Sequence, residues 1–164
     1  MERQEGDRTG VAEDEPEGCL TCRLIAARDA GEAELWDSIY RTHWWDVVHA
    51  YDSSLLGWIV LVAKPHLSAI DQLSSEAATE LGLLIRDVSV FLRSYTGCAK
   101  TYVLQFAEHP EHPHVHFHVV PRRDDAPEAL RGPGVFGYLG ASDQSRVPEA
   151  AMNDLALALR RHLA

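Results

Sequence analysis

The sequence has few cysteines, no long apolar run and no cluster of basic residues. Three cysteines among 164 residues are too few, and odd in number, for a disulfide framework. No stretch approaches the ~20 apolar residues of a membrane helix, and the polar start of the chain does not fit a signal peptide. The 15 lysines and arginines face 25 acidic residues and form no run, which disfavours nucleic-acid binding without excluding a local cationic pocket. We therefore expect a cytoplasmic protein that binds neither nucleic acid nor a membrane.

Residues 1–17 carry much of the negative charge. Seven acids and two arginines stand there with few apolar residues, which accounts for five of the ten net negative charges. Such a segment cannot bury enough surface to offset its ordering entropy, so we predict a disordered acidic tail. Residues 18–164 contain no repeat or long linker and can build one core, so we predict a single domain there.

The apolar patterns predict several strands. Aromatic and β-branched residues between 36 and 51 indicate one or two strands. The continuous apolar run at 57–63 is typical of a central strand, and its end delivers His66 to a loop. Further strands are predicted at 101–106 and 114–120. We expect the four tryptophans, which could also wall a base pocket, to lie in the core.

Two helices complete the predicted fold. Apolar residues recur at helical spacing behind Ser74 or Ser75, and Gly97 is placed to end this long helix. A C-terminal amphipathic helix begins near Pro148. Because the early strands are separated by hairpin-length spacing, we predict an α+β fold with an antiparallel sheet rather than alternating βαβ units.

The segment from 114 to 120 is the most informative, because histidines alternate there with bulky apolar residues. Side chains on a strand alternate between faces, so His114, His116 and His118 project from one face while their neighbours pack into the core. The imidazoles then form a row at a spacing of about 7 Å. A neutral imidazole can attack phosphorus, and a neighbouring one can donate to a phosphate oxygen. A solvated or metal-collecting histidine edge is the alternative interpretation.

Cys19 and Cys22 stand in a C-x-x-C spacing. In a chain without an export signal, this spacing indicates half of a metal site, a redox pair or two ordinary reduced cysteines. Cys98 is isolated, and we expect it to be a small buried apolar side chain.

The run H-V-H-F-H-V-V-P-R from His114 to Arg122 resembles the signature of the histidine triad family of nucleotide hydrolases and transferases. The C-x-x-C, the strand leading into Lys64-Pro65-His66 and the long helix stand in the order that the family shows. The resemblance covers about residues 18 to 122. It implies a histidine triad-like fold, a homodimer, and hydrolysis of nucleoside 5′-phosphate derivatives, such as phosphoramidates or dinucleoside polyphosphates, at the α-phosphorus.

The resemblance also implies roles for individual residues. His116 would take the nucleoside monophosphate as a phosphoramidate and yield it to water, while His118 would hydrogen-bond the α-phosphate. Cys19, Cys22, His66 and His114 would hold a structural zinc ion, because such a closed set leaves no position for water. Two alternatives stay open: transfer of the nucleotide to an acceptor other than water, and a zinc-stabilised nucleotide-binding module without turnover.

The sequence departs from the family just before the triad. Many members carry Gly-Gln-Ser/Thr there, whereas this chain reads E-H-P-E-H-P over residues 108–113. His112 or His109 could supply a proton to the leaving group, and His112 is our candidate catalytic residue. A solvated surface-loop histidine is the alternative interpretation of each. The family's ribose-binding acid has no clear equivalent, so His49 and Tyr51 are the candidates to bind substrate, together with Gln105 near the phosphates.

Overall fold

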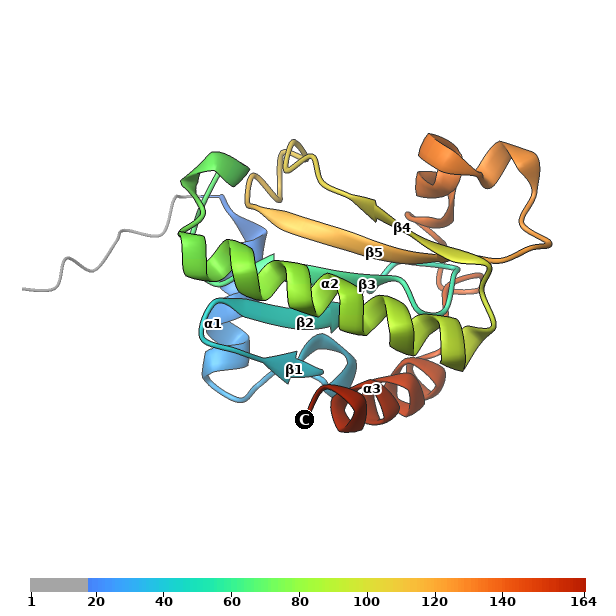
Figure 1. The fold of residues 1–164 in the computed structure, drawn as a ribbon, viewed down its shortest axis with the longest axis horizontal. Helices are drawn as coiled ribbons and strands as arrows, with labels where there is room; N and C mark the ends of the chain where they lie inside the picture. Colours follow the sequence, from blue (N-terminus) through green and yellow to red (C-terminus); the bar gives the residue numbers. More distant parts are fainter. Residues whose placement is uncertain (1–17) are drawn as a thin grey trace, which may run out of the picture.

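A five-stranded antiparallel sheet forms the centre of the protein, with the strand order β1-β2-β3-β5-β4 (Figure 1). This computed structural model describes residues 18–164, so the tail predicted at 1–17 lies outside the described residues. The strands are β1 Tyr40–Arg41, β2 Trp45–His49, β3 Ile59–Ala63, β4 Lys100–Leu104 and β5 His116–Arg122. The antiparallel α+β fold is therefore confirmed.

Three α-helices and several short 3₁₀ turns surround the sheet. The helices are α1 Leu20–Asp29, α2 Ser75–Thr96 and α3 Glu149–Leu163, and the turns include η1 Leu35–Asp37 and η4 Gly132–Tyr138. The long helix matches its prediction closely, because the Ser74 hydroxyl accepts the Ala77 N–H and Gly97 ends the helix at φ 68°. No helix within residues 18–164 is long and apolar enough to cross a bilayer.

The two faces of the sheet are covered differently. Apolar residues of α2 and α3 pack with β2, β3 and β5 in the main core, which holds Val47, Leu61 and Val119. On the opposite face, α1 covers Val48 and the η4 segment covers Val120. His116 and His118 share the alternation of Val120, so they belong to this second face, between α1 and η4.

Helix α1 is the main element that the sequence did not predict. Its buried residues are Thr21, Cys22, Ile25 and Arg28. Because two of these four are polar, the buried face gives no apolar stripe at helical spacing, which is the pattern that identifies a helix in a sequence. The two polar residues are paired with other buried or half-buried groups: Thr21 with His112, and Arg28 with Asp37 and Asp46.

Candidate active site and metal centre

Four potential metal ligands from three segments converge at one end of the sheet. Cys19 and Cys22 lie at the start of α1, His66 follows β3, and His114 precedes β5. Their ligand atoms all lie within 4.8 Å of one another. The predicted ligand set is thus brought together, although the four residues span almost a hundred positions of the chain.

The spacing of these atoms fits a four-coordinate ion. A tetrahedral site with Zn–S near 2.3 Å and Zn–N near 2.05 Å requires ligand atoms about 3.3 to 3.8 Å apart. The Cys22 Sγ and His66 Nδ1 atoms are 3.3 Å apart, the two histidine Nδ1 atoms 3.2 Å, and Cys19 Sγ lies 3.7 Å from His114 Nδ1. The donor set of two thiolates and two imidazoles is one that zinc prefers, so these residues fit that metal.

The second nitrogen of His114 supports the same assignment. His114 is fully buried, and its Nε2–H donates to the Ala63 carbonyl oxygen at 2.6 Å. This bond places the proton on Nε2 and leaves the Nδ1 lone pair facing the two cysteines. The bond also ties the ligand set to the end of β3.

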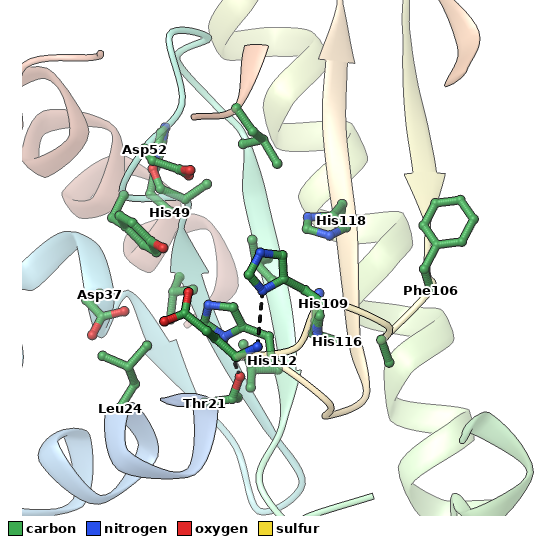
Figure 2. A pocket seen from close by; sticks show the side chains of 18 of the residues that line it. Thr21, Leu24, Asp37, His49, Asp52, Phe106, His109, His112, His116 and His118 are labelled. Atoms are coloured by element: carbon green, nitrogen blue, oxygen red, sulfur yellow. Dashed lines mark hydrogen bonds between the residues drawn. The ribbon is translucent and has the colours of Figure 1, made fainter. Parts of the chain in front are cut away.

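A cavity of about 540 Å³ opens on the same face of the sheet (Figure 2). Its apolar floor includes Val48 of β2 with Val60 and Val62 of β3. His116 and His118 line it from β5, because their register opposite Val62 and Val60 places them beside this floor. The predicted nucleophile and its neighbour therefore face a space large enough for a nucleotide-sized ligand.

His116 carries its proton on Nδ1. Its Nδ1–H donates to the His114 carbonyl oxygen at 2.6 Å. Burial lowers the pKa of His116, which favours the neutral ring. In the neutral ring Nε2 then holds a free lone pair, the arrangement that a nucleophilic imidazole needs.

His118 has the opposite tautomer. The indole Nε1–H of Trp58 donates to His118 Nδ1 at 2.9 Å, and indole nitrogen can only donate. Burial, with smaller contributions from His116 and His112, lowers the pKa of His118 to about 3. The ring is therefore neutral with its proton on Nε2. With ring centroids 4.9 Å apart, His116 and His118 form an acceptor and a donor side by side.

His112 is held by a residue of the metal-binding helix. Its Nδ1 lies 2.8 Å from the hydroxyl of Thr21, which stands between the two cysteines (Figure 2). The ring is half-buried, lines the cavity and has its centroid 6.5 Å from that of His116. His109 is exposed, and its Nδ1 accepts the Glu111 N–H at 3.2 Å. His109 lines the cavity as well, so the two histidines differ in burial and partner: His112 is half-buried and bonded to Thr21 of α1, whereas His109 is exposed and bonded within its own loop.

Of the three residues predicted to bind substrate, Tyr51 and His49 line the cavity and Gln105 does not. Tyr51 lines the cavity and is 46% exposed, whereas Gln105 is not among the described residues that line it. His49 borders the cavity, but its Nδ1–H donates to the Ala50 carbonyl and its Nε2 accepts the Gly57 N–H. Burial lowers the pKa of His49 to about 4, which favours the neutral ring, and both of its nitrogens are engaged by backbone groups.

Several cavity residues were not predicted as site residues from the sequence. They are Thr21, Asp37, Asp52, Phe106, Phe136 and Leu139. Asp52 lies between β2 and β3, directly after Tyr51, and belongs to no motif that marks it as a site residue. Phe136 and Leu139 belong to a Gly- and Pro-containing segment that shows no catalytic motif and reaches the site only through tertiary packing.

The buried arginine beside the cavity is neutralised within the protein. Arg28 donates to Asp37 at 2.7 Å and to Asp46 at 3.5 Å, while Arg41 donates to the other oxygen of Asp46 at 2.7 Å. Burial raises the pKa of Asp37, against the lowering effect of Arg28. Because Arg28 has two carboxylate partners, its charge is compensated within the protein.

No family model matches the sequence, and no curated protein matches it. Several solved structures do match this chain. A histidine triad protein from Bradyrhizobium japonicum is 23% identical, with a TM-score of 0.65 over 77% of this chain and 90% of its own. One from Marinobacter aquaeolei is 21% identical, with a TM-score of 0.63 over 84% and 95%. A zinc-bound histidine triad family protein from Mycobacterium smegmatis is 18% identical, with a TM-score of 0.59 over 87% and 94%.

These similarities define the class of fold: the chain has the histidine triad fold. The resemblance found in the sequence is therefore confirmed at the level of the fold. The homodimer and the cytoplasmic location stay predictions.

Proposed function

We propose that this protein is a histidine triad hydrolase that splits nucleoside 5′-phosphate derivatives at the α-phosphorus through a nucleotidyl-histidine intermediate. The observation that carries the proposal is the pair of opposed tautomers on β5. His116 offers a lone pair at Nε2, and His118 offers an N–H beside it. The fold of the solved histidine triad proteins supports the same function.

The residues of the site divide the reaction into two displacements. His116 Nε2 forms a bond to phosphorus while the bond from phosphorus to the leaving group breaks, and the leaving group takes up a proton. His118 Nε2–H donates to a non-bridging phosphate oxygen, where negative charge builds up. The His114 carbonyl, which accepts the Nδ1–H of His116, stabilises the positive charge that the phosphorylated ring acquires. Water then displaces His116 and yields the nucleoside monophosphate.

We propose zinc at the cluster of Cys19, Cys22, His66 and His114. The Mycobacterium smegmatis protein with the same fold is zinc-bound, and the four ligand atoms here fit a tetrahedral ion. With four protein ligands the site is closed, so its role is structural. It joins the start of α1 to the segment that enters β5, and thereby supports both His116 and His112.

The covalent intermediate gives the direct test of this function. Protein mixed with adenylated and guanylated phosphoramidates and esters, then quenched within seconds, should gain the mass of one nucleoside monophosphate. Peptide mapping should place the added mass on His116. A nucleotide that binds without any mass gain, at every quench time and with every compound, would instead support the non-catalytic binding module.

His112 is proposed to deliver the proton to the leaving group. His112→Ala should slow release of a basic alkylamine from a nucleoside phosphoramidate by about a hundredfold, the usual contribution of a general acid. Release of nitrophenolate, which needs no proton, should change less than threefold. Rates of both substrates with the wild type, His112→Ala and the loop control His109→Ala decide this. Equal losses for both substrates, or none, would show that leaving-group protonation lies elsewhere.

A further inference from the structure

The cavity continues past His116 and His118 toward β4, the edge strand of the sheet. Phe106 and Ala107, which follow β4, line it together with Phe136 of η4. Because β5 stands between β3 and β4, these residues lie across the histidines from the apolar floor of β2 and β3. Figure 2 shows the same arrangement, with Phe106 beyond His118 as seen from Leu24 and Asp37.

Two aromatic rings, those of Phe106 and Phe136, line this part of the cavity. The centroids of Phe106 and Phe136 are 5.6 Å apart with an interplanar angle of 57°, and Phe136 lies 5.6 Å from His118 at 90°. Phe136 is packed among apolar residues, whereas Phe106 is 63% exposed. An exposed phenylalanine that lines this cavity beside two histidines leaves much apolar surface in water unless a ligand covers it.

The backbone next to Phe106 has an unusual conformation. Ala107 has φ 57°, and among residues 18–164 no other residue except glycine has a positive φ. This conformation costs on the order of 1 kcal/mol for a residue with a Cβ atom, and such residues concentrate at functional sites. Here it turns the chain directly after Phe106 and starts the loop that carries His112.

The polar groups of the cavity indicate which end receives the nucleoside. Ribose hydroxyls need acceptors held in place. Four carboxylates line the cavity: Glu108 and Glu111 are exposed in the loop after Phe106, whereas the two at the β2 end are half-buried and held by hydrogen bonds. Asp37 is 13% exposed and bound by Arg28, and Asp52 accepts the Gly140 N–H at 2.9 Å. The Phe106 end offers aromatic surface instead. With the α-phosphate at His116 and His118, the nucleoside and the leaving group then extend to opposite ends.

We propose that Phe106 and Phe136 form a subsite for a planar aromatic ring carried by the leaving group. This inference rests on the proposed function and adds the class of substrate: a nucleoside 5′-phosphate whose phosphorus carries an aromatic-bearing group. A flat ring can stack on or edge against the two phenylalanines at the usual centroid distances of about 4.5 to 7 Å.

A matched pair of leaving groups tests the subsite. Adenosine 5′-phosphoramidates of 2-phenylethylamine and 2-cyclohexylethylamine have the same leaving atom and chain length but differ in a flat and a puckered ring. The wild type should favour the phenyl compound about fivefold in kcat/KM, from the extra stabilisation of an aromatic pair. Phe106→Leu should bring this ratio to within twofold of one. Tyr95→Leu, which removes an exposed aromatic ring from α2 on the other face, should keep the wild-type ratio and rates.

The possible results distinguish a failure of the proposed subsite from a failure of the proposed function. A wild-type kcat/KM ratio near one for the two compounds, or an unchanged ratio in Phe106→Leu, would overturn the subsite. Cleavage of both compounds through His116 would in that case still support the proposed function. Failure of both compounds, together with no mass gain on His116 from any nucleotide, would overturn the proposed function and the subsite with it. Because Phe106 is mostly exposed, its leucine variant should fold normally, and the melting temperature checks this.

Discussion

Replacing His116 by alanine should abolish turnover, with a loss of at least about 10⁴-fold in kcat, because the variant lacks the Nε2 lone pair that stands beside the N–H of His118. His118 presents an N–H there instead, since Trp58 occupies its Nδ1. The variant should also gain no nucleotide mass in the quench experiment. Rates measured with a nitrophenyl nucleotide ester report the loss without any need for leaving-group protonation.

The same substitution should leave the fold nearly intact. The His116 ring faces the cavity, and its one recorded hydrogen bond is to the His114 carbonyl. Loss of one such bond costs about 1 kcal/mol, a shift of a few degrees in melting temperature for a domain of this size. His162→Ala, which removes an exposed histidine from α3, is the matched control and should keep full activity. Substantial turnover by a contaminant-free His116→Ala preparation would refute the nucleophile assignment.

The alternation of strand side chains made the shared face of His116 and His118 predictable. Val115, Phe117 and Val119 do pack against the main core, and His116 and His118 do lie on the opposite face. The predicted spacing of about 7 Å applies to positions along the strand. The ring centroids approach to 4.9 Å because the side chains incline toward each other, and rotamers are set by neighbours that the strand period does not reveal.

The partners of the histidines could not be predicted, because they come from distant segments. Trp58 was expected in the core, where it is fully buried, yet its indole N–H also sets the tautomer of His118. Thr21 appeared only as a spacer inside C-x-x-C, but its hydroxyl orients His112. Each contact depends on tertiary packing between elements that are more than fifty residues apart in the sequence.

Removal of the metal is the second change with a large expected effect. Zinc should copurify at about one ion per chain, and Cys22→Ser should lower both metal content and stability. Loss of one thiolate from a four-ligand site weakens a structural ion whose binding free energy contributes directly to folding. We expect a loss of about 4 kcal/mol, which corresponds to a fall in melting temperature of roughly 10 °C for a domain of this length.

Activity should fall when the metal is lost, because the metal cluster supports the two side chains that we propose to be catalytic, His116 and His112. The His114 ring belongs to the metal cluster, and the His114 carbonyl accepts the hydrogen bond from the Nδ1–H of His116. Thr21, between the two cysteines, orients His112 in the same way. Metal analysis, calorimetry and rates should be compared between Cys22→Ser and the control Cys98→Ser, which changes a buried cysteine outside the cluster and should keep its zinc. If wild-type protein holds far less than one ion per chain, and Cys22→Ser melts no lower than Cys98→Ser, then the four residues are not a structural zinc site and the orientation of His116 does not depend on it.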